Sequence, residues 1–469
     1  MRLFNTASSK IEEFTPLNPP VVTFYMCGPT VYDYTHIGHI RTFIGNDILR
    51  RTLAYDNFQV KTVMNITDVG HLSGDNDEGD DKLEKGATKA GKTVWEIAEF
   101  FTKYFFYSMG KVNVLRPDIV PKATEHVGEM IEMIKALEEK GFTYTTSEAV
   151  YFDISKISDY GKLHGQKLEE KKQAVREDVY VDKEKKHPAD FVLWFKRVGR
   201  FADHTMHWDS PWGEGFPGWH IECSAMAKKY LGETLDIHSG GVDHISIHHT
   251  NEIAQSEAAN GKQFVRFWMH NEFLLVDGFK MSKSLGNFYT VDDVIKKGIN
   301  PLALRYLFLQ SHYRQQMNFT WESLTAASEG LKNLSKMVGR LKKQESRDTL
   351  SSEKLNQLDQ YRGQFFESIN NDLQTGKAIA TMWELLKSNI PSNDKYDLIM
   401  EFDQVLGLQL SEISDSDLTI PAEITELGEQ RKMAKMNKDF KKADEIRQQI
   451  LDLGYNISDN AGSYIIEKN

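Results

Sequence analysis

An apolar strand pattern, a turn and a helical pattern follow one another near the start of the chain, and this order limits the possible folds more than any other feature. Val21 to Met26 has the pattern of a buried strand, Gly28-Pro29 that of a turn, and Ile37 to Tyr55 carries apolar residues at helical spacing. Val60 to Ile66 has the pattern of a second strand, and Val94 to Met109 that of a strongly aromatic helix. Because strands that alternate with helices form parallel sheets, the sequence predicts a parallel α/β sheet.

The same alternation returns later in the chain. Leu235 to Ile237 and Phe264 to Met269 are strand-like, and His249 to Ala259 between them has helical spacing. Between the two parts lies a charge-rich stretch, roughly Ile119 to Phe201, with the run Lys183 to Lys186 near its end. We therefore predict a split, Rossmann-like nucleotide-binding sheet with a subdomain inserted between its halves.

The last third of the chain has a different pattern. From Pro301 onward it is helical, with apolar spacing near 3.6 in Leu302 to Leu309, Ser323 to Leu341 and Leu358 to Leu386. Residues 411–421 are acidic, rich in Ser and Asp and end in Pro, which is typical of a linker. A basic helical module follows, and its segment Gly454 to Ile466 is suited to a small hairpin. We expect a helical bundle and then a compact C-terminal module.

Composition argues against a membrane-spanning, an exported or a disulfide-rich protein. The 469 residues are 40% hydrophobic and 27% charged, as in ordinary soluble proteins, and no apolar run reaches the ~20 residues of a membrane span. Met1 to Phe14 lacks an export signal, and two cysteines are too few for a disulfide framework, so we expect a cytoplasmic protein.

The net charge of −11 at first argues against a nucleic-acid partner. Binding needs only a local basic surface, however, and the chain has basic runs at Lys332 to Lys343 and between Glu429 and Arg447. A solvated helix face is the favoured interpretation of either run taken alone.

The first candidate functional motif is His36-Ile37-Gly38-His39, which follows the first predicted strand. Its two histidines are three residues apart and share one face at the start of a helix, where free backbone N–H groups and the helix dipole favour phosphate. Gly38 leaves room for a nucleotide to approach, and imidazole donors there could stabilise charge on an attacked phosphate. On these four residues alone, two helix-start histidines without a role are the favoured interpretation.

The second motif is Lys280-Met281-Ser282-Lys283-Ser284, a loop between Gly278 and Gly286. Lysine suits a loop that closes over a triphosphate because it is a flexible point charge for the departing pyrophosphate. An ordinary surface loop is the alternative. In this order and setting, the two motifs resemble the HIGH and KMSKS signatures of class I aminoacyl-tRNA synthetases.

That resemblance implies ATP-dependent activation of an amino acid. It implies that His36 and His39 act with Lys283, the second lysine of the motif, in catalysis, with Lys280 assisting. It also implies that Gly38, Ser282 and Ser284 contact ATP, which enters with Mg²⁺.

A third group of residues has donor side chains suited to a metal. Cys27 ends the first strand and Cys223 lies nearly two hundred positions later, so spacing alone favours two buried structural cysteines. His248 and Glu252 are four residues apart on a predicted helix, which is a metal-ligand spacing. His220 and Cys223, three residues apart, could equally be paired as ligands.

These segments resemble cysteinyl-tRNA synthetases, and the similarity runs from about Leu3 to the C-terminus. The resemblance implies one Zn²⁺ per subunit, held by Cys27, Cys223, His248 and Glu252, which binds the thiol of substrate L-cysteine. It implies a substrate pocket that includes Thr67, Trp219 and His238. A metal–thiolate bond would reject serine and alanine without an editing domain, whereas one methylene or hydroxyl is worth only ~1–3 kcal/mol in an apolar pocket.

The partners implied are L-cysteine, ATP and tRNA(Cys), with no membrane and with a monomer as the expected state. Residues 1–118 and 202–272 would form the halves of the catalytic domain around the insert 119–201. Residues 273–320 would form the lysine loop and a region that contacts the tRNA stem. The bundle 321–410, the linker 411–421 and an anticodon-binding module, 422–469, would follow.

The chain also departs from the family's pattern. Val69 to Leu72 and the acidic insertion Asp75 to Asp81 replace a more usual acidic and lysine run, and Thr250 stands where glutamate is common. The insertion could bind a divalent ion, although a solvated acidic turn is favoured. Two other functions stay open. One is a ligase that joins cysteine to an amino sugar, and residues 422–469 argue against it. The other is a non-catalytic regulator, and the presence of both motifs argues against it.

Overall fold

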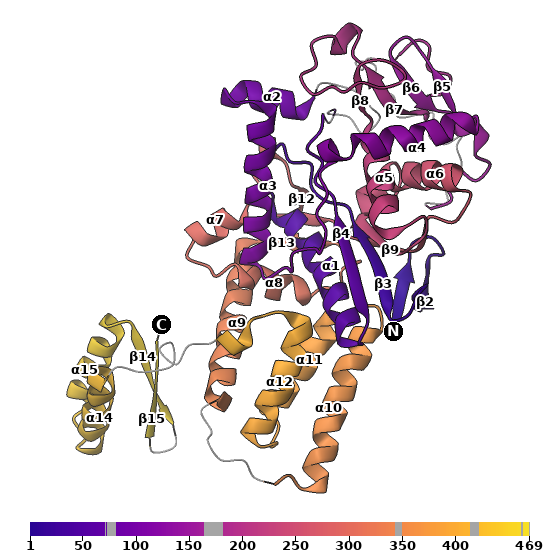
Figure 1. The fold of residues 1–469 in the computed structure, drawn as a ribbon. Coiled ribbons are helices and arrows are strands. Elements are labelled where there is room, and N and C mark those ends of the chain that lie inside the picture. Colours follow the sequence, from indigo (N-terminus) through magenta and orange to yellow (C-terminus); the bar gives the residue numbers. More distant parts are fainter. Residues whose placement is uncertain are drawn as a thin grey trace.

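A parallel sheet lies at the centre of the molecule (Figure 1). The computed structural model describes residues 1–70, 72, 81–163, 182–342, 349–412, 422–460 and 463–468. The sheet has the order β10-β9-β3-β4 and is formed by β3 (Val21–Met26), β4 (Gln59–Met64), β9 (Leu235–Gly241) and β10 (Val265–Asn271). All its neighbours are parallel, with Phe24 opposite Ile237 and Val22 opposite Val60. The predicted split parallel sheet is confirmed.

Helices cover both faces of this sheet, because alternate strand residues point to opposite sides. Phe24 and Met26 pack with the apolar side of α1 (Ile37–Tyr55), while Tyr25 packs with α5 (Trp219–Leu231) and α6 (His248–Asn260). The helix α3 (Val94–Lys111) lies beside α1, after the short α2 (Lys82–Ala90). The helices predicted at 37–55, 94–109 and 249–259 are thus confirmed, the last two with slightly longer bounds.

An antiparallel unit is inserted between the two halves of the sheet (Figure 1). Its strands are β5 (Thr143–Thr145), β6 (Ala149–Phe152), β7 (Phe191–Lys196) and β8 (Gly215–Pro217), paired in chain order. The helix α4 (Val127–Glu139) packs its apolar side into the same core. The last strand, β8, lies beyond residue 201 and leads directly into α5, so this small sheet positions the start of α5.

A short sheet and a helical bundle follow β10. β11 (Leu274–Val276), β12 (Phe279–Lys280) and β13 (Met317–Phe319) surround the lysine loop, with α7 (Val291–Lys296) and α8 (Leu302–Leu309) after it. A two-stranded ribbon, β1 (Arg2–Asn5) and β2 (Lys10–Glu13), packs against β10. The bundle consists of α9 (Trp321–Lys342), α10 (Ser352–Asn370), α11 (Thr375–Lys387) and α12 (Ser392–Leu406).

The continuous helical pattern expected from Leu358 to Leu386 is wrong in one respect. The chain breaks between α10 and α11, where Asp372 and Leu373 adopt positive φ values of 59° and 53°. The carboxylate of Asp372 is buried and accepts hydrogen bonds from Tyr313, Arg314 and the Phe4 amide. These tertiary contacts hold Asp372 in a conformation that no helix allows.

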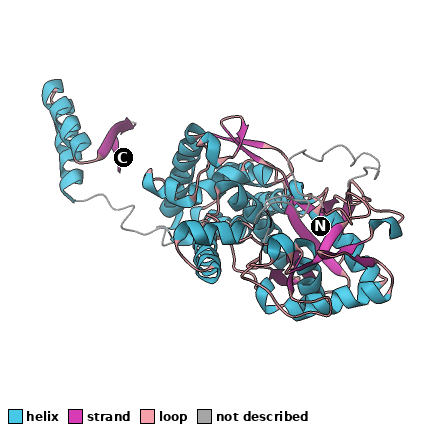
Figure 2. Ribbon diagram, turned by 90° about the horizontal axis from the view of Figure 1, so that it is seen from above, coloured by secondary structure: helices cyan, strands magenta, loops and turns pink. Residues whose placement is uncertain are grey.

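The C-terminal residues form a separate small unit. α14 (Ala422–Met436), α15 (Phe440–Asp452) and the antiparallel hairpin β14 (Tyr455–Asn460) and β15 (Ser463–Lys468) share a core of isoleucines. Figure 1 and Figure 2 show this unit set apart from the bundle. The predicted hairpin is confirmed.

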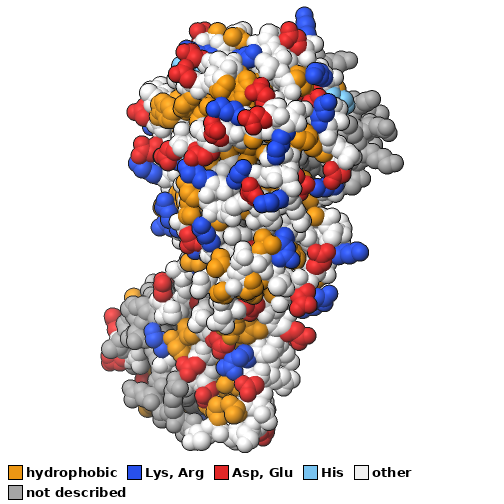
Figure 3. All heavy atoms as spheres, turned by 45° about the vertical axis from the view of Figure 1, so that its right-hand side comes forward, with side chains coloured by type: hydrophobic (Ala, Val, Ile, Leu, Met, Phe, Trp, Pro, Cys, Tyr) orange, Lys and Arg blue, Asp and Glu red, His pale blue; other side chains and the backbone are white. Residues whose placement is uncertain are grey.

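Two predictions fall mainly outside the described residues. They are the acidic insertion, of which only Asp81 is described, and the linker, of which residues 411–412 are described. Asp81 caps α2 and its carboxylate contacts buried His204 at 3.0 Å. Among the described residues, no helix has both the length and the apolar composition that crossing a membrane requires. The face drawn in Figure 3 carries basic and acidic side chains close together, without a field of one sign.

Candidate active site and metal centre

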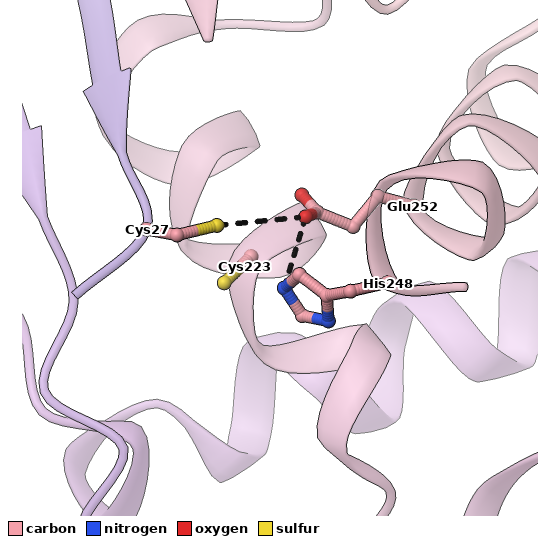
Figure 4. A group of neighbouring side chains, drawn as sticks. All are labelled: Cys27, Cys223, His248 and Glu252. Atoms are coloured by element: carbon pink, nitrogen blue, oxygen red, sulfur yellow. Dashed lines mark hydrogen bonds and ion pairs between the residues drawn. The ribbon is translucent and has the colours of Figure 1, made fainter. Parts of the chain in front are cut away.

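A cluster of four donor side chains lies at the carboxyl end of the central sheet, where ligands bind in open α/β folds. Cys27 follows the last residue of β3, and its amide donates to Ser239 O of β9 at 3.0 Å. Cys223 comes from α5, and His248 and Glu252 come from successive turns of α6. Figure 4 shows the four side chains pointing toward one another. Their ligand atoms all lie within 4.8 Å of one another.

The cluster is almost completely closed to solvent. Glu252 is 0% exposed and Cys27, the most open of the four, 7%. The Glu252 carboxylate lies between two imidazoles, with Oε1 3.0 Å from His248 Nε2 and Oε2 2.9 Å from His238 Nε2. Burial opposes the ionisation of Glu252, but the two histidines outweigh it and hold its pKa far below the ordinary value. The cluster therefore contains a fixed negative charge.

The two thiols differ in acidity because their neighbours differ. Burial, together with the Cys223 sulfur, raises the pKa of Cys27 well above its ordinary value. Burial also opposes ionisation of Cys223, but hydrogen bonds from Cys27 and His248 outweigh it and lower its pKa to about 6. One thiolate is thus available near neutral pH, and thiolates are the form in which cysteine binds metals.

His220 has a role different from the alternative that the spacing left open. Its Nδ1 lies 3.0 Å from His248 Nδ1, on the far side of the His248 ring from Glu252. Among the described residues, neither group of side chains that could hold a metal contains His220, whereas Cys223 is grouped with His248. The geometry therefore favours His248 over His220 as the partner of Cys223 in this cluster. His220 contacts His248 and can orient its ring, as an outer hydrogen-bond partner of a metal ligand does.

A chain of hydrogen bonds supports Cys27 from the other side. His249 Nε2 lies 3.2 Å from Cys27 Sγ, His249 Nδ1 lies 2.7 Å from His270 Nε2, and His270 Nδ1 lies 2.8 Å from Thr6 Oγ1. Burial lowers the pKa of both histidines well below 6.5, so each ring is neutral and carries one proton. If Thr6 donates to His270, each ring in turn donates toward Cys27, so the chain can stabilise its thiolate.

The residues expected in the substrate pocket surround this cluster. His238 contacts Glu252, and the ring of Trp219 stacks on His248 with centroids 4.2 Å apart. Thr67 Oγ1 donates to Glu222 Oε2 at 2.7 Å, next to Cys223. Buried polar atoms without a hydrogen-bond partner among the described residues also lie here. They are Glu222 Oε1, His238 Nδ1 and Ser239 Oγ. Unpaired buried polar atoms are costly, so their concentration at this place is typical of a site for a polar ligand.

The histidine motif begins α1 as predicted, but its backbone N–H groups are not free. His36 is the N-cap, and its Nδ1 accepts from the amides of Gly38 and His39 at 3.1 and 3.2 Å. The amide of Ile37 donates to Tyr289 O. The expectation of free helix-start amides is therefore wrong, because a histidine cap satisfies them. Since Nδ1 accepts, the neutral His36 ring carries its proton on Nε2 and can donate it to a ligand.

The two motif histidines stack on each other, with ring centroids 3.6 Å apart. Burial, and a positive charge on His39, lower the pKa of His36 well below its ordinary value. Although His39 keeps part of its surface exposed, desolvation by surrounding atoms lowers its pKa to about 4. Asp243 and His244 also act on His39, and the His244 ring lies 5.3 Å from that of His248. The motif and the metal cluster are therefore neighbours.

The lysine loop lies against the histidine motif. A Cβ on Gly38 would lie 2.5 Å from Met281 Cε, so the absent side chain at Gly38 makes room for this loop as well. The ring of Phe288 packs edge-on to His36 at 5.2 Å, and Lys283 Nζ lies 5.2 Å from the same ring. Two segments more than two hundred residues apart thus meet at the start of α1.

Within this loop the two lysines have different partners. Lys283 is 60% exposed and forms an ion pair with Asp33, while Lys280 Nζ lies 5.4 Å from the ring of Phe273. Ser282 and Ser284 share a hydrogen bond of 2.7 Å that shapes the turn. The loop therefore carries an exposed cation beside His36, paired with the Asp33 carboxylate.

Comparison with known proteins gives the family. A family model described as the catalytic domain of class I (C) tRNA synthetases matches residues 13–329. A cysteine–tRNA ligase of Treponema denticola is 45% identical over 98% of this chain and 98% of its own length. Another, of Borreliella burgdorferi, is 43% identical over 95% of each chain. The chain belongs to the cysteine–tRNA ligase family.

Solved structures of other class I synthetases share the fold. A Mycobacterium tuberculosis methionyl-tRNA synthetase in complex with methionyl-adenylate is similar over 84% of this chain and 89% of its own, with a TM-score of 0.57 and 14% identity. An Agrobacterium radiobacter LeuRS, in a ternary complex with tRNA and LeuAMS, gives a TM-score of 0.63 over 86% of both chains at 10% identity. The predicted fold class is thereby confirmed.

Three residues that shape the site of this cysteine–tRNA ligase family member were not expected from the sequence. They are Asp33, His249 and His270. The sequence could have suggested His249, because it directly follows the candidate ligand His248. It could also have suggested Asp33, which lies three residues before the histidine motif. His270 had no such signal, since only the pairing of β10 beside β9 brings it to the cluster.

Proposed function

We propose that this chain attaches L-cysteine to tRNA(Cys) in two steps, as an ATP-dependent ligase. A carboxylate oxygen of cysteine attacks the α-phosphorus of ATP, the bond to pyrophosphate breaks, and cysteinyl-adenylate forms. A hydroxyl of the terminal tRNA ribose then attacks the cysteinyl carbonyl carbon, and AMP leaves. The observation that carries the proposal is the buried group of Cys27, Cys223, His248 and Glu252 beside the two motifs.

The donor set of this cluster fits zinc. Two sulfurs, an imidazole and a carboxylate are ligands that zinc takes in proteins, and the low pKa of Cys223 supplies a thiolate. When bound, zinc would supply a Lewis acid that takes the thiol of substrate cysteine as thiolate, which a serine hydroxyl cannot match. The unpaired atoms of Glu222, His238 and Ser239 leave polar positions for the rest of the amino acid.

Amino-acid activation would fall to the two motifs. His36 would donate from Nε2, and His39 from the same helix face, to oxygens of the attacked phosphate. Lys283 would leave Asp33 and place its charge on the departing pyrophosphate, with Lys280, Ser282 and Ser284 assisting. Mg²⁺ would enter with ATP. No protein nucleophile is required, so positioning and charge would provide the catalysis.

Recognition of the tRNA would involve the C-terminal unit. α14 and α15 carry exposed Met436 and Phe440 among lysines, a combination suited to unstacked anticodon bases. We also propose the division into catalytic halves, insert, bundle and anticodon-binding module, with a monomer in the cytoplasm as the working form.

The test is transfer of labelled cysteine to unfractionated tRNA, run with and without a zinc chelator, beside cysteine-dependent exchange of pyrophosphate into ATP. We expect both activities, and we expect the chelator to abolish both. Exchange without charging would favour the amino-sugar ligase, and neither activity would favour a non-catalytic regulator.

A variant separates the metal from the rest of the site. Cys223→Ser should lose bound zinc and cysteine affinity together, whereas Met226→Leu, one turn further along α5, should keep both. Full zinc occupancy in Cys223→Ser would contradict the assignment of this ligand.

A further inference from the structure

The helix α3 presents an aromatic face to solvent that the core does not use. Phe100, Tyr104, Tyr107 and Lys111 follow one another at intervals of four, three and four residues, so they share one face of the helix. Phe100 and Tyr107 are each 43% exposed. Tyr104 between them is half-buried. Large aromatic side chains usually pack in the core, and exposed ones that share a helix face are typical of a binding surface.

This face continues to the candidate active site through Tyr34. The Tyr34 ring is 42% exposed and packs edge-on to Phe100 and Tyr104, with centroids 6.1 and 4.8 Å away. Tyr34 directly follows Asp33, the partner of Lys283, and lies two residues before His36. At the other end, the Tyr107 hydroxyl donates to Asp292 at 3.3 Å, in the helix that follows the lysine loop.

Lysines flank the aromatic face at both ends. Lys92 Nζ lies 5.4 Å from the ring of Phe100, and Lys111 Nζ lies 5.2 Å from that of Tyr107. The neighbouring acidic residues have other partners: Glu96 caps the helix with Thr93, and Glu99 pairs with Lys103. Exposed rings with lysines beside them are what proteins use to hold single-stranded nucleic acid, by stacking bases and attracting the backbone.

The length of the face also suits a short single strand. Phe100 and Lys111 are separated by about 16 Å at the rise of an α-helix. That distance accommodates about four nucleotides at the spacing of stacked bases. A short unpaired 3′ end is what a tRNA must deliver to the adenylate.

We propose that Tyr34, Phe100 and Tyr107, with Lys92 and Lys111, hold the unpaired 3′ end of the tRNA as it enters the site. The inference rests on the proposed function, which needs the terminal ribose to arrive beside His36. The rings stack on bases of this strand and the lysines contact the phosphates, without reading the base sequence.

The test is the KM for tRNA in charging by Phe100→Ala, Tyr107→Ala and the double variant. Loss of one stacked base should raise this KM at least 5-fold in each single variant and more in the double variant. Cysteine-dependent pyrophosphate exchange, which needs no tRNA, is the reference activity and should change less than 2-fold. Phe100→Trp and Tyr107→Phe keep the rings and should keep the KM.

Trp95 provides a matched control on the same helix. It is 49% exposed but lies on a different face of α3, so Trp95→Ala should leave the KM for tRNA unchanged. A second control is the substrate: with tRNA that lacks its unpaired 3′ nucleotides, the Ala variants and the parent chain should bind with equal affinity.

Four results would overturn the inference. The first is an unchanged KM in the double variant. The second is an equal loss in Trp95→Ala, and the third is a penalty that persists with the truncated tRNA. The fourth is a concentration-dependent dimer of the parent chain, seen by sedimentation, that the Ala variants lose, since the face would then bind a second copy. Failure of the parent chain to charge any tRNA would instead contradict the proposed function.

Discussion

The metal cluster and the lysine loop lie close together, yet they are built in opposite ways. The four cluster side chains come from the residue after β3, from α5 and from α6, and are at most 7% exposed, and two histidines fix the Glu252 carboxylate. Lys283 is 60% exposed, on a loop that contacts the start of α1 through Phe288 and Met281 and pairs with Asp33, three residues before His36. In the proposed mechanism, amino-acid recognition is therefore arranged before substrate arrives, whereas the Lys283 charge for pyrophosphate still has to move.

The physical reason lies in the cost of misplacing each group. A buried carboxylate without its partners costs several kcal/mol, so the cluster has few alternative arrangements. An exposed ion pair is worth about 0–1 kcal/mol, so Lys283 can exchange Asp33 for a phosphate at little cost. Selection between cysteine and serine needs the first property, and binding and releasing a triphosphate needs the second.

The largest effect should follow from Glu252→Gln, which removes the charge at the centre of the cluster. Since His238 and His248 both lose an ionic partner in a buried place, zinc affinity should fall about 1000-fold. The measurement is zinc retained after dialysis against a graded chelator. Glu257→Gln, on the same helix and paired with Lys162 near the surface, should retain zinc. Equal retention by Glu252→Gln would show that the carboxylate is not part of the metal site.

The next effect should come from Lys283→Ala. Removing one charge that stabilises the transition state should lower kcat for pyrophosphate exchange about 100-fold. Zinc content and thermal stability should not change, because the side chain is exposed. Lys297→Ala, whose ammonium lies over Trp321, is the control and should keep full exchange. Loss of zinc in Lys283→Ala would contradict the contrast between cluster and loop, since the loop would then be needed to hold the metal-binding side chains in place.

A smaller effect should follow from His270→Phe, which cuts the hydrogen-bond chain behind Cys27. His249 would lose the partner that keeps its proton on Nε2, so zinc affinity should fall about 10- to 100-fold. Thr6→Val, at the far end of the same hydrogen-bond chain, should also lower the zinc affinity, but by a smaller factor. Wild-type affinity in both variants would mean that Cys27 needs no support beyond its backbone.

The smallest effect should follow from Asp33→Asn, which frees Lys283 in the absence of ATP. The KM for ATP should fall by up to about 5-fold, because the lysine no longer leaves an ion pair to reach the phosphates. Steady-state exchange at varied ATP measures this. A 10-fold or greater loss of kcat would show that Asp33 takes part in the reaction, rather than only pairing with Lys283 while ATP is absent.

Much of the fold follows from local pattern. The strand at Val21 to Met26 and the helix at Ile37 to Tyr55 have the bounds that the apolar spacing predicts. The break after Asn370 does not follow, because it depends on partners of Asp372 that lie far away in the chain. Local propensity cannot include such contacts.

In the site, too, some features follow from local sequence pattern and others depend on contacts between distant segments. His248 and Glu252 are suggested by helical spacing, but so are His220 and Cys223, and only the packing of α5 against α6 decides between them. The link from Cys27 to Cys223 came from family resemblance, since no spacing rule connects residues so far apart. The capping of α1 by His36 depends on a side-chain rotation that the sequence does not encode visibly.

Cys27 and Cys223 are the only cysteines in the 469 residues, both are free thiols, and both belong to the cluster. Any reagent that reacts with thiols in this protein therefore reacts only at the cluster. Alkylation rates, counted by mass, would follow metal loading directly, with zero, one or two added groups and no background from elsewhere. The same fact makes the protein vulnerable, because one oxidation event that joins the two sulfurs would remove two donors at once.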